Sequence, residues 1–464
     1  MKNLLLSSLV SFNVISVFNS KYIPLTIEAI DGGIVTISNC PKGDMWFSGN
    51  EGELTPIVSD SMKFSLDAGD KLSLYANGTG NTAKAEEEES AVYLNIQCSS
   101  DCYVYGNFMS LIRKDDYQNL FKVPAYAFDK LFFKNSHIRN HDTKNIVLPA
   151  TTLADYCYAQ MFGCCTSLTR APELPATTLG DYCYYEMFVN CTNLTQAPKK
   201  MLATTMGPYC CFRMFYGCTS LTQAPALSIA EFAKSSCESM FGGCNSLKIV
   251  PSIVTPKAVL ADGCCYRMFY GCTSLTQAPE LPATKFAESS CESMFEGCTS
   301  LTTISSVGTM NAVLAENCCY NMFKGCTSLR QAPDLPARTL AESCYENMFQ
   351  DCTSLTEAPE LPATKMADSC YQSMFQGCTS LTKAPELKAT SLVGDYPGGC
   401  YESMFQDCTS LNSITCLATD ISAIHCTEDW LQGVSSRGTF TKAKSSSWAE
   451  GASGIPTGWT VKEQ

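Results

Sequence analysis

Cys344-Tyr-Glu-Asn-Met348-Phe349-Gln-Asp-Cys352-Thr-Ser-Leu355-Thr-Glu-Ala-Pro359 decides the fold, because the chain contains ten near-copies of this stretch. The second cysteine recurs every 26 to 30 residues, and a Met-Phe pair precedes it in every copy. Self-similarity at such a period predicts a solenoid, in which each coil buries its apolar residues against its neighbours. The second cysteines are Cys165, Cys191, Cys218, Cys244, Cys272, Cys298, Cys326, Cys352, Cys378 and Cys408.

Each unit is predicted to contain a short helix. Thr339 and Glu342 are spaced as a capping box, in which both side chains bind free amides at a helix start. A residue that tolerates the left-handed conformation precedes the second cysteine in nine units, and Cys164 is the exception. The apolar residues that share one face at helical spacing are Leu340, Cys344, Met348 and Phe349.

A short strand is predicted to follow the helix, at Leu355–Leu361 in the quoted unit. Its prolines lack the amide that a full ladder needs, so the pairing between coils should be local and interrupted. If the Leu and Ala of Leu-Thr-x-Ala point inward, the x position points outward, and a row of such residues can build a binding face. The alternative is a row of solvated polar residues on a spacer. We define the polar row as Arg170, Gln196, Gln223, Gln277, Thr303, Gln331, Glu357 and Lys383; Ile249 and Ser413 hold the same position, and Glu173, Glu280, Asp334, Glu360 and Glu386 lie three residues further along.

The flanks of the array differ from it. Residues 1–21 are either a leader or an N-terminal docking segment, because a lysine and an apolar stretch lack a clean cleavage site. Residues 22–106 are predicted to form a small β-sandwich, with hairpins around Asp31-Gly32-Gly33 and around residues 67–70. Residues 107–150 are interpreted as a junction and degenerate capping repeat, 151–417 as the ten repeats, and 418–464 as a C-terminal cap holding three tryptophans.

The 29 cysteines call for an explanation. Most occupy the repeat positions, where cysteine acts as a small buried hydrophobe. Thiols in adjacent coils stacked at sheet spacing would lie about 5 Å apart, which permits a disulfide without requiring one. We predict free buried thiols, with disulfides as the alternative.

Charge and composition exclude several functions. A net charge of -13 and a pI near 4.8 argue against non-specific nucleic-acid binding and against a polybasic hold on lipid. We find no apolar run long enough for membrane insertion. Only three histidines are present, so an enzyme is the weaker alternative. It would need a Cys–His nucleophile pair, formed by His425 with Cys416 or Cys426, or a metal site at His137 and His141. The sequence predicts no catalytic residues, no metal and no cofactor.

The unit Cys-Tyr-x-x-Met-Phe-x-Gly-Cys-Thr-Ser-Leu-Thr-x-Ala-Pro-Glu-Leu-Pro-Ala-Thr resembles the BspA-type leucine-rich repeat, which shares an Ala/Met-Phe-x-x-Cys-x-x-Leu core. The resemblance covers about 120–417. The flanks also resemble those of surface proteins of Bacteroides-group bacteria and of fibre or tail proteins of their phages. The prolines after Leu-Thr-x-Ala depart from the common pattern.

The expected fold is therefore an α/β repeat solenoid of the leucine-rich-repeat type, preceded by a small all-β sandwich. The resemblance implies a non-catalytic solenoid for adhesion or ligand binding, outside the cell. A bacterial surface adhesin that binds a protein or glycan on a host or neighbouring cell and a phage receptor-binding fibre are both open. The oligomeric state is not predicted.

Overall fold

The architecture comes from a computed structural model that describes residues 20–41, 43–81, 92–227, 229–304, 306–309, 311–395 and 398–464. The chain divides into two compact units, Met1–Pro225 and Ala226–Gln464, and each is described by itself. Among the described residues from 22 onward, regular structure consists of strands and two short 3-10 helices, η2 (Phe108–Leu111) and η3 (Tyr117–Asn119). None of the helices in the described part has the length and apolar character to cross a bilayer.

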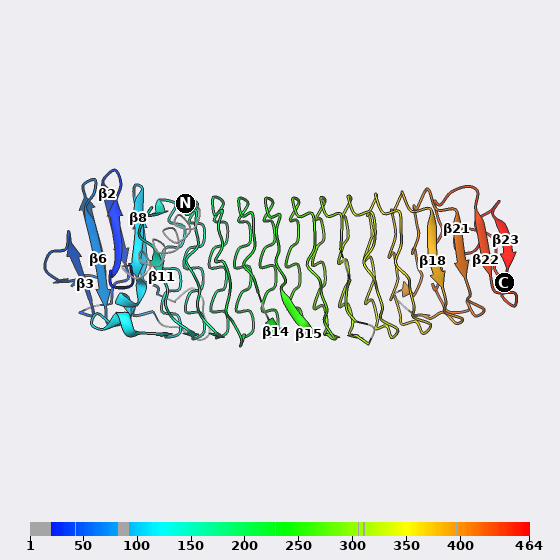
Figure 1. Ribbon diagram of the computed structural model, residues 1–464, viewed down its shortest axis with the longest axis horizontal. Coiled ribbons are helices and arrows are strands. Elements are labelled where there is room, and N and C mark those ends of the chain that lie inside the picture. The colour runs from blue at the N-terminus through cyan, green and yellow to red at the C-terminus, as the bar shows by residue number, and fades with distance from the viewer. Residues whose placement is uncertain are drawn as a thin grey trace, which may run out of the picture. The chain divides into compact units, whose positions relative to one another are not determined.

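The first unit begins with two sheets (Figure 1). In the larger sheet, β8 and β6 flank β1 in antiparallel pairs, and β3 and β4 extend that order. The smaller sheet has the antiparallel order β5-β2-β7. The rings of Phe47 and Phe64, one from each sheet, meet edge to face at 4.7 Å, so the two sheets touch. The strands are β1 (Leu25–Ala29), β2 (Gly33–Ser38), β3 (Met45–Gly49), β4 (Thr55–Pro56), β5 (Ser61–Leu66), β6 (Lys71–Ala76), β7 (Asn95–Cys98) and β8 (Cys102–Asn107).

Both predicted hairpins are wrong. β1 and β2 lie in different sheets, and so do β5 and β6, so each tight connection carries the chain from one sheet to the other. The Gly32-Gly33 pair, which suggested a hairpin turn, is needed for a different reason. A Cβ on Gly33 would lie 2.0 Å from Oγ of Ser100 in the β7–β8 connection. The Gly pair thus permits close contact of two connections. Local alternation identified the strands but not their partners, which are chosen by packing.

The larger sheet continues into the first coil. The parallel strands β10 (Ile138–Asn140) and β11 (Ile146–Val147) both pair with β8. Residues in the predicted junction already make the coil contacts of the repeats, because the Phe132 ring stacks on Phe162 at 5.8 Å. A separate parallel sheet of these coils contains β9 (Lys122–Val123), β12 (Thr152–Leu153) and β13 (Thr178–Leu179).

The helix predicted in each unit is wrong, and a run of tight turns takes its place. Alternate amides donate within the coil and to the next coil: Ala159 N–H binds the Tyr156 carbonyl at 3.1 Å, whereas Tyr158 N–H binds the Cys183 carbonyl at 2.9 Å. Every fourth residue is left-handed, as at Ser343, Asn347 and Asp351 in the second unit, with φ of 49°, 54° and 60°. Since half of the amides bind the neighbouring copy, stacking overrides the local helical pattern.

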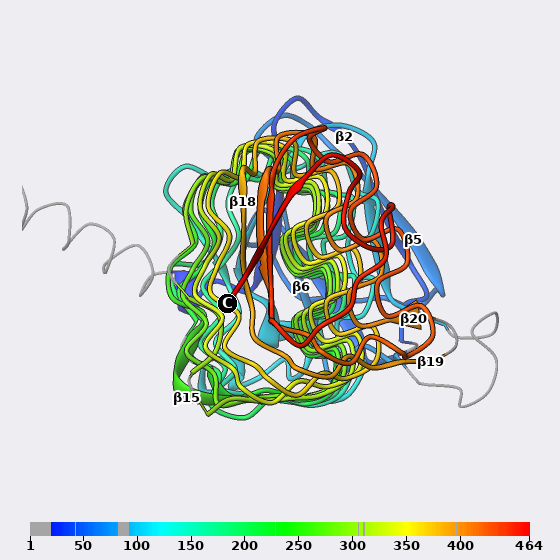
Figure 2. The ribbon, with the colours of Figure 1, turned by 90° about the vertical axis from the view of Figure 1, so that its right-hand side faces the viewer.

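The core consists of ladders of identical side chains. In the second unit the rings of Phe241, Phe269, Phe295, Phe323, Phe349, Phe375 and Phe405 stack in sequence, with centroids 5.4 to 5.7 Å apart and planes within 12°. The Met, Phe, Leu and second Cys of each unit are fully buried. Viewed end-on in Figure 2, the coils of this unit overlie one another, as the ladders require.

Pairing after the second cysteine is interrupted, as the prolines predict. It consists of isolated bridges such as Gln277 with Thr303 and Gln331 with Glu357. At this position the longer strands are Lys383–Leu387 and Ser413–Cys416, in the last coils. There the fully buried Trp430 stacks on Tyr401 at 6.3 Å. The strands of the second unit are β14 (Ile229–Glu231), β15 (Val254–Leu260), β16 (Lys285–Phe286) and β17 (Val313–Leu314) in one parallel sheet, β18 (Lys383–Leu387), β21 (Ser413–Cys416), β22 (Thr439–Lys442) and β23 (Thr460–Glu463) in another, and the antiparallel pair β19 (Gly394–Asp395) and β20 (Gly398–Gly399).

Candidate ligand-binding site

The polar row lies at the surface. The Leu two residues before each member is fully buried, so the alternation of inward and outward side chains holds from unit to unit. Bridges align neighbouring members: Arg170 pairs with Gln196 in the first unit, and Gln331 pairs with Glu357 in the second. Arg170 is half-buried and the other members are exposed, with Gln196 and Gln223 in the first unit and Gln277, Thr303, Gln331, Glu357 and Lys383 in the second.

The acidic residues three positions further along are also exposed. In the second unit these acids and Glu357 outnumber Lys383, the one cation at the same two sets of positions. Glu386 lies 4.0 Å from Lys388, at the long limit of an ion pair. The acids of this unit are Glu280, Asp334, Glu360 and Glu386.

In the first unit, part of the polar row borders a pocket of about 730 Å³. Arg170 and Gln196 both line it, together with Glu173. Ile146 and Leu148, only 6% and 3% exposed, contribute apolar surface. The rest of the wall is Lys21, Phe121, Asn140, Asn145, Val147, Pro149, Ala171, Pro172, Pro175, Ala197 and Lys199.

The side chain of Asn140 fixes the backbone at Arg170. Its Oδ1 accepts from the amides of Thr169 and Arg170 at 3.0 and 2.8 Å, and its Nδ2 donates to the Arg170 carbonyl at 3.0 Å. The Asn140 side chain therefore makes the hydrogen bonds that the backbone of the preceding coil would otherwise make. Nη2 of Arg170 donates to the His141 carbonyl at 3.1 Å, which orients the guanidinium.

The cysteines are buried, as predicted, with Cys164 half-buried, and all are free thiols. The second-cysteine thiols donate to the carbonyl of the preceding coil's Phe, as Cys298 does to Phe269 at 3.2 Å. Burial raises the pKa of the Cys298 thiol to about 12. A nucleophilic thiol needs a lowered pKa and access to solvent. The second-cysteine thiols have neither, so their role is to pack in the core.

The histidines form other contacts than those considered for catalysis or metal binding. His425 bonds Glu428 through Nδ1, and this bond raises the pKa of the imidazole. Nδ1 of His137 lies 3.2 Å from Asp101, whereas Nδ1 of His141 accepts the Thr143 amide at 3.0 Å. Within the described residues, no cluster of three or more His, Cys, Asp or Glu could hold a metal.

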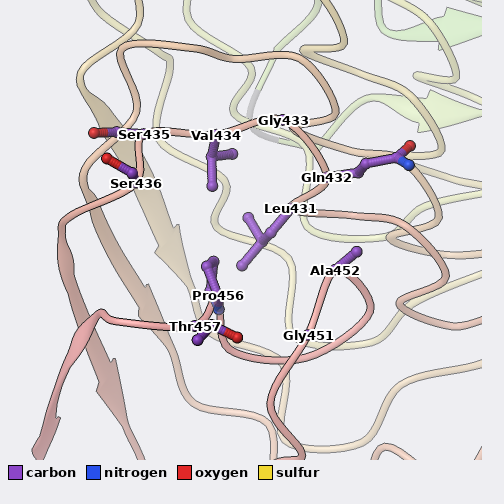
Figure 3. Close-up of a pocket in the computed structure, with 10 residues that line it drawn as sticks. All are labelled: Leu431, Gln432, Gly433, Val434, Ser435, Ser436, Gly451, Ala452, Pro456 and Thr457. Carbon is purple, nitrogen blue, oxygen red and sulfur yellow. The ribbon is translucent and has the colours of Figure 1, made fainter.

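A smaller pocket of about 270 Å³ lies in the second unit (Figure 3). Leu431 and Pro456 point into it from two neighbouring loops, with Ser435 and Thr457 at its edge. No charged side chain lines it. It therefore offers few groups that could select a ligand.

Two surface features of the first unit have no counterpart among the residues predicted from the sequence. The 730 Å³ pocket needs Lys21 and Phe121, which lie outside the repeats. The second feature is a half-exposed stack of Tyr126, Tyr156, Tyr182 and Tyr209, whose centroids are 4.6 to 5.0 Å apart. Tyr182 follows Tyr156 by 26 residues and Tyr209 follows Tyr182 by 27, and this recurrence was a signal that could have revealed the stack.

Comparison with known proteins identifies the type of the repeats. The family model described as "BspA type Leucine rich repeat region" matches in six copies, within residues 212–331, 264–397 and 315–422. A solved structure, a leucine-rich repeat protein from Bacteroides ovatus, is 16% identical and covers 79% of this chain and 94% of its own, with a TM-score of 0.27. That score is too low to show a shared fold by itself. Among curated proteins, none matches.

Proposed function

We propose that this chain, whose residues 212–422 match the BspA-type leucine-rich repeat model, is a non-catalytic binding protein whose polar row holds a partner. The observation that carries this proposal is the alignment of exposed side chains on successive coils, such as Gln331 beside Glu357. Backbone bridges fix their spacing, so a partner meets them without an ordering cost in the backbone. Extended faces of this kind suit a protein or a glycan chain.

The proposed role is adhesion outside the cell, with the partner on a host or neighbouring cell. The match to BspA-type repeats supports it, because the repeat unit and its flanks resemble those of surface proteins. Surface biotinylation of intact source cells should label the protein. Recovery of the protein with purified virions instead would replace this location with a phage fibre.

A glycan and protein array probed with the full chain tests the binding role. A partner that engages the second unit should lose affinity on Glu357→Gln, by about fivefold to tenfold for one charge-assisted hydrogen bond. Glu342→Gln is a charge-matched control, because Glu342 is exposed in the same copy but outside the polar row. Equal losses in both variants would indicate attraction to net charge alone. No loss from Glu357→Gln, Gln331→Ala or Gln277→Ala would refute the polar row as the contact surface.

A further inference from the structure

The 730 Å³ pocket of the first unit has the size and wall of a small-molecule site. Such sites measure roughly 300–1,000 Å³ and combine apolar walls with a few placed polar groups. Here Ile146 and Leu148 are held by the fold, because β11 pairs with β8. Phe121 is 46% exposed and offers an aromatic ring to a ligand. The apolar wall therefore fits a ring body and not a fully hydrated polar chain.

Three cations and one carboxylate line this pocket, in a chain whose net charge is -13. Lys199 is exposed, and among the described residues neither it nor Glu173 forms an ion pair. Lys21 lies 5.5 Å from the centroid of the Phe121 ring, so its ammonium stays at the apolar wall. The local charge is opposite to that of the whole protein, which favours an anionic ligand.

Arg170 is the cation that the fold positions best. Asn140 fixes its backbone, and the His141 carbonyl accepts one N–H of its guanidinium. A guanidinium carries five N–H donors, so four are left to bind a carboxylate or sulfate in a forked geometry. The next members of the polar row in this unit, Gln196 and Gln223, are neutral, so Arg170 is the charged member of the row here.

We propose that the pocket binds a small amphipathic anion: an apolar ring body that bears a carboxylate, sulfate or sulfonate. The ring body lies against Phe121, Ile146 and Leu148, and the anionic group meets Arg170 with Lys199 beside it. This site is separate in chemistry from the proposed macromolecular partner of the polar row, although both include Arg170 and Gln196.

The test uses the full chain and two fluorescent probes that share one ring body. Anilinonaphthalene sulfonate carries the anionic group, and phenylnaphthylamine lacks it. We expect saturable binding of the sulfonate at one site, weaker binding of the neutral probe, and a loss of sulfonate affinity as salt is raised. Equal affinity for both probes, or no saturable binding, would refute the anionic specificity.

Variants locate the site. Arg170→Gln should weaken the sulfonate about tenfold and leave the neutral probe unchanged, because only the charge-assisted bonds are lost. Lys365→Gln is the matched control: it removes an exposed cation of the second unit that lies outside the polar row, and it should change neither probe. Ala171→Trp should fill the pocket and reduce binding of both probes.

The outcomes separate this proposal from the polar-row function. If Arg170→Gln and Lys365→Gln reduce sulfonate binding equally, attraction to surface charge explains the signal and the pocket proposal is wrong. If both bind as the parent does, the proposal is also wrong. Glu357→Gln tests the polar row without touching this pocket, so either proposal can fail while the other stands.

Discussion

The buried thiols make the second unit sensitive to alkali. Burial raises the pKa of Cys298, Cys370, Cys408 and Cys416 from the ordinary value near 9 to about 12. The folded unit therefore holds protons that the unfolded chain releases above pH 9. Stability from these groups is complete below pH 9 and is lost as the pH rises toward 12.

The magnitude follows from the size of the shift. At pH 10 the thiolate form of an unfolded cysteine exceeds the thiol form by about ten to one, whereas the folded cysteine stays a thiol. Each such group therefore lowers the free energy of unfolding by about 1.4 kcal/mol. Four of them remove about 5–6 kcal/mol, which is comparable to the whole stability of many domains. Burial also raises the pKa of other thiols in the same ladders, such as Cys326, well above its ordinary value, and these thiols add to the loss. We expect the coils to unfold between about pH 10 and 11.

Circular dichroism and thiolate absorbance, recorded on one sample during a pH titration, measure this transition. Both signals should change together and steeply, because the thiols ionise only when the coils open. Cys298→Ala provides the control: it removes one titrating group, so the slope of stability against pH between 9 and 11 should decrease even though the variant starts less stable. Gradual ionisation of the thiols near pH 9 with intact circular dichroism would refute the reasoning.

Two further predictions concern single side chains. At pH 8, iodoacetamide should modify Cys164 first, because it is the one cysteine that is not buried; peptide mass mapping that finds buried thiols labelled equally fast would contradict this. Phe295→Ala should cost about 3–5 kcal/mol of stability in urea unfolding, since the ring stacks on Phe269 and Phe323 at 5.4 and 5.5 Å. Phe295→Leu, which keeps more of the volume, should cost clearly less.

Several structural features could be predicted from the repeat alone. The recurrence of Met348-Phe349 and Cys352 in every unit predicts burial, because one side chain per coil can leave water only against its own copies. The outward direction of Gln331 and Glu357 follows from the buried Leu329 and Leu355 that precede them. The prolines correctly predicted interrupted pairing, because they have no amide to donate.

The candidate site could be predicted only in part. Gln331 and Glu357 were identified because every unit repeats their position. The pocket beside Arg170 was not, because its walls include Lys21, Phe121 and Asn145, which lie outside the ten repeats and hold no recurring position. The role of Asn140 could not be predicted from the sequence either. Its side chain can bond the backbone of Arg170 only where the fold brings the two residues together.

By itself, the sequence determined the period, the buried positions and the outward polar row, because each depends on spacing along a single copy. Tertiary structure alone decided that Tyr158 donates its amide to the next coil instead of completing a helical turn, and that β1 and β2 part into different sheets. Backbone hydrogen bonds are interchangeable between local and distant partners. Which partner an amide takes therefore depends on the neighbour that packing brings within reach.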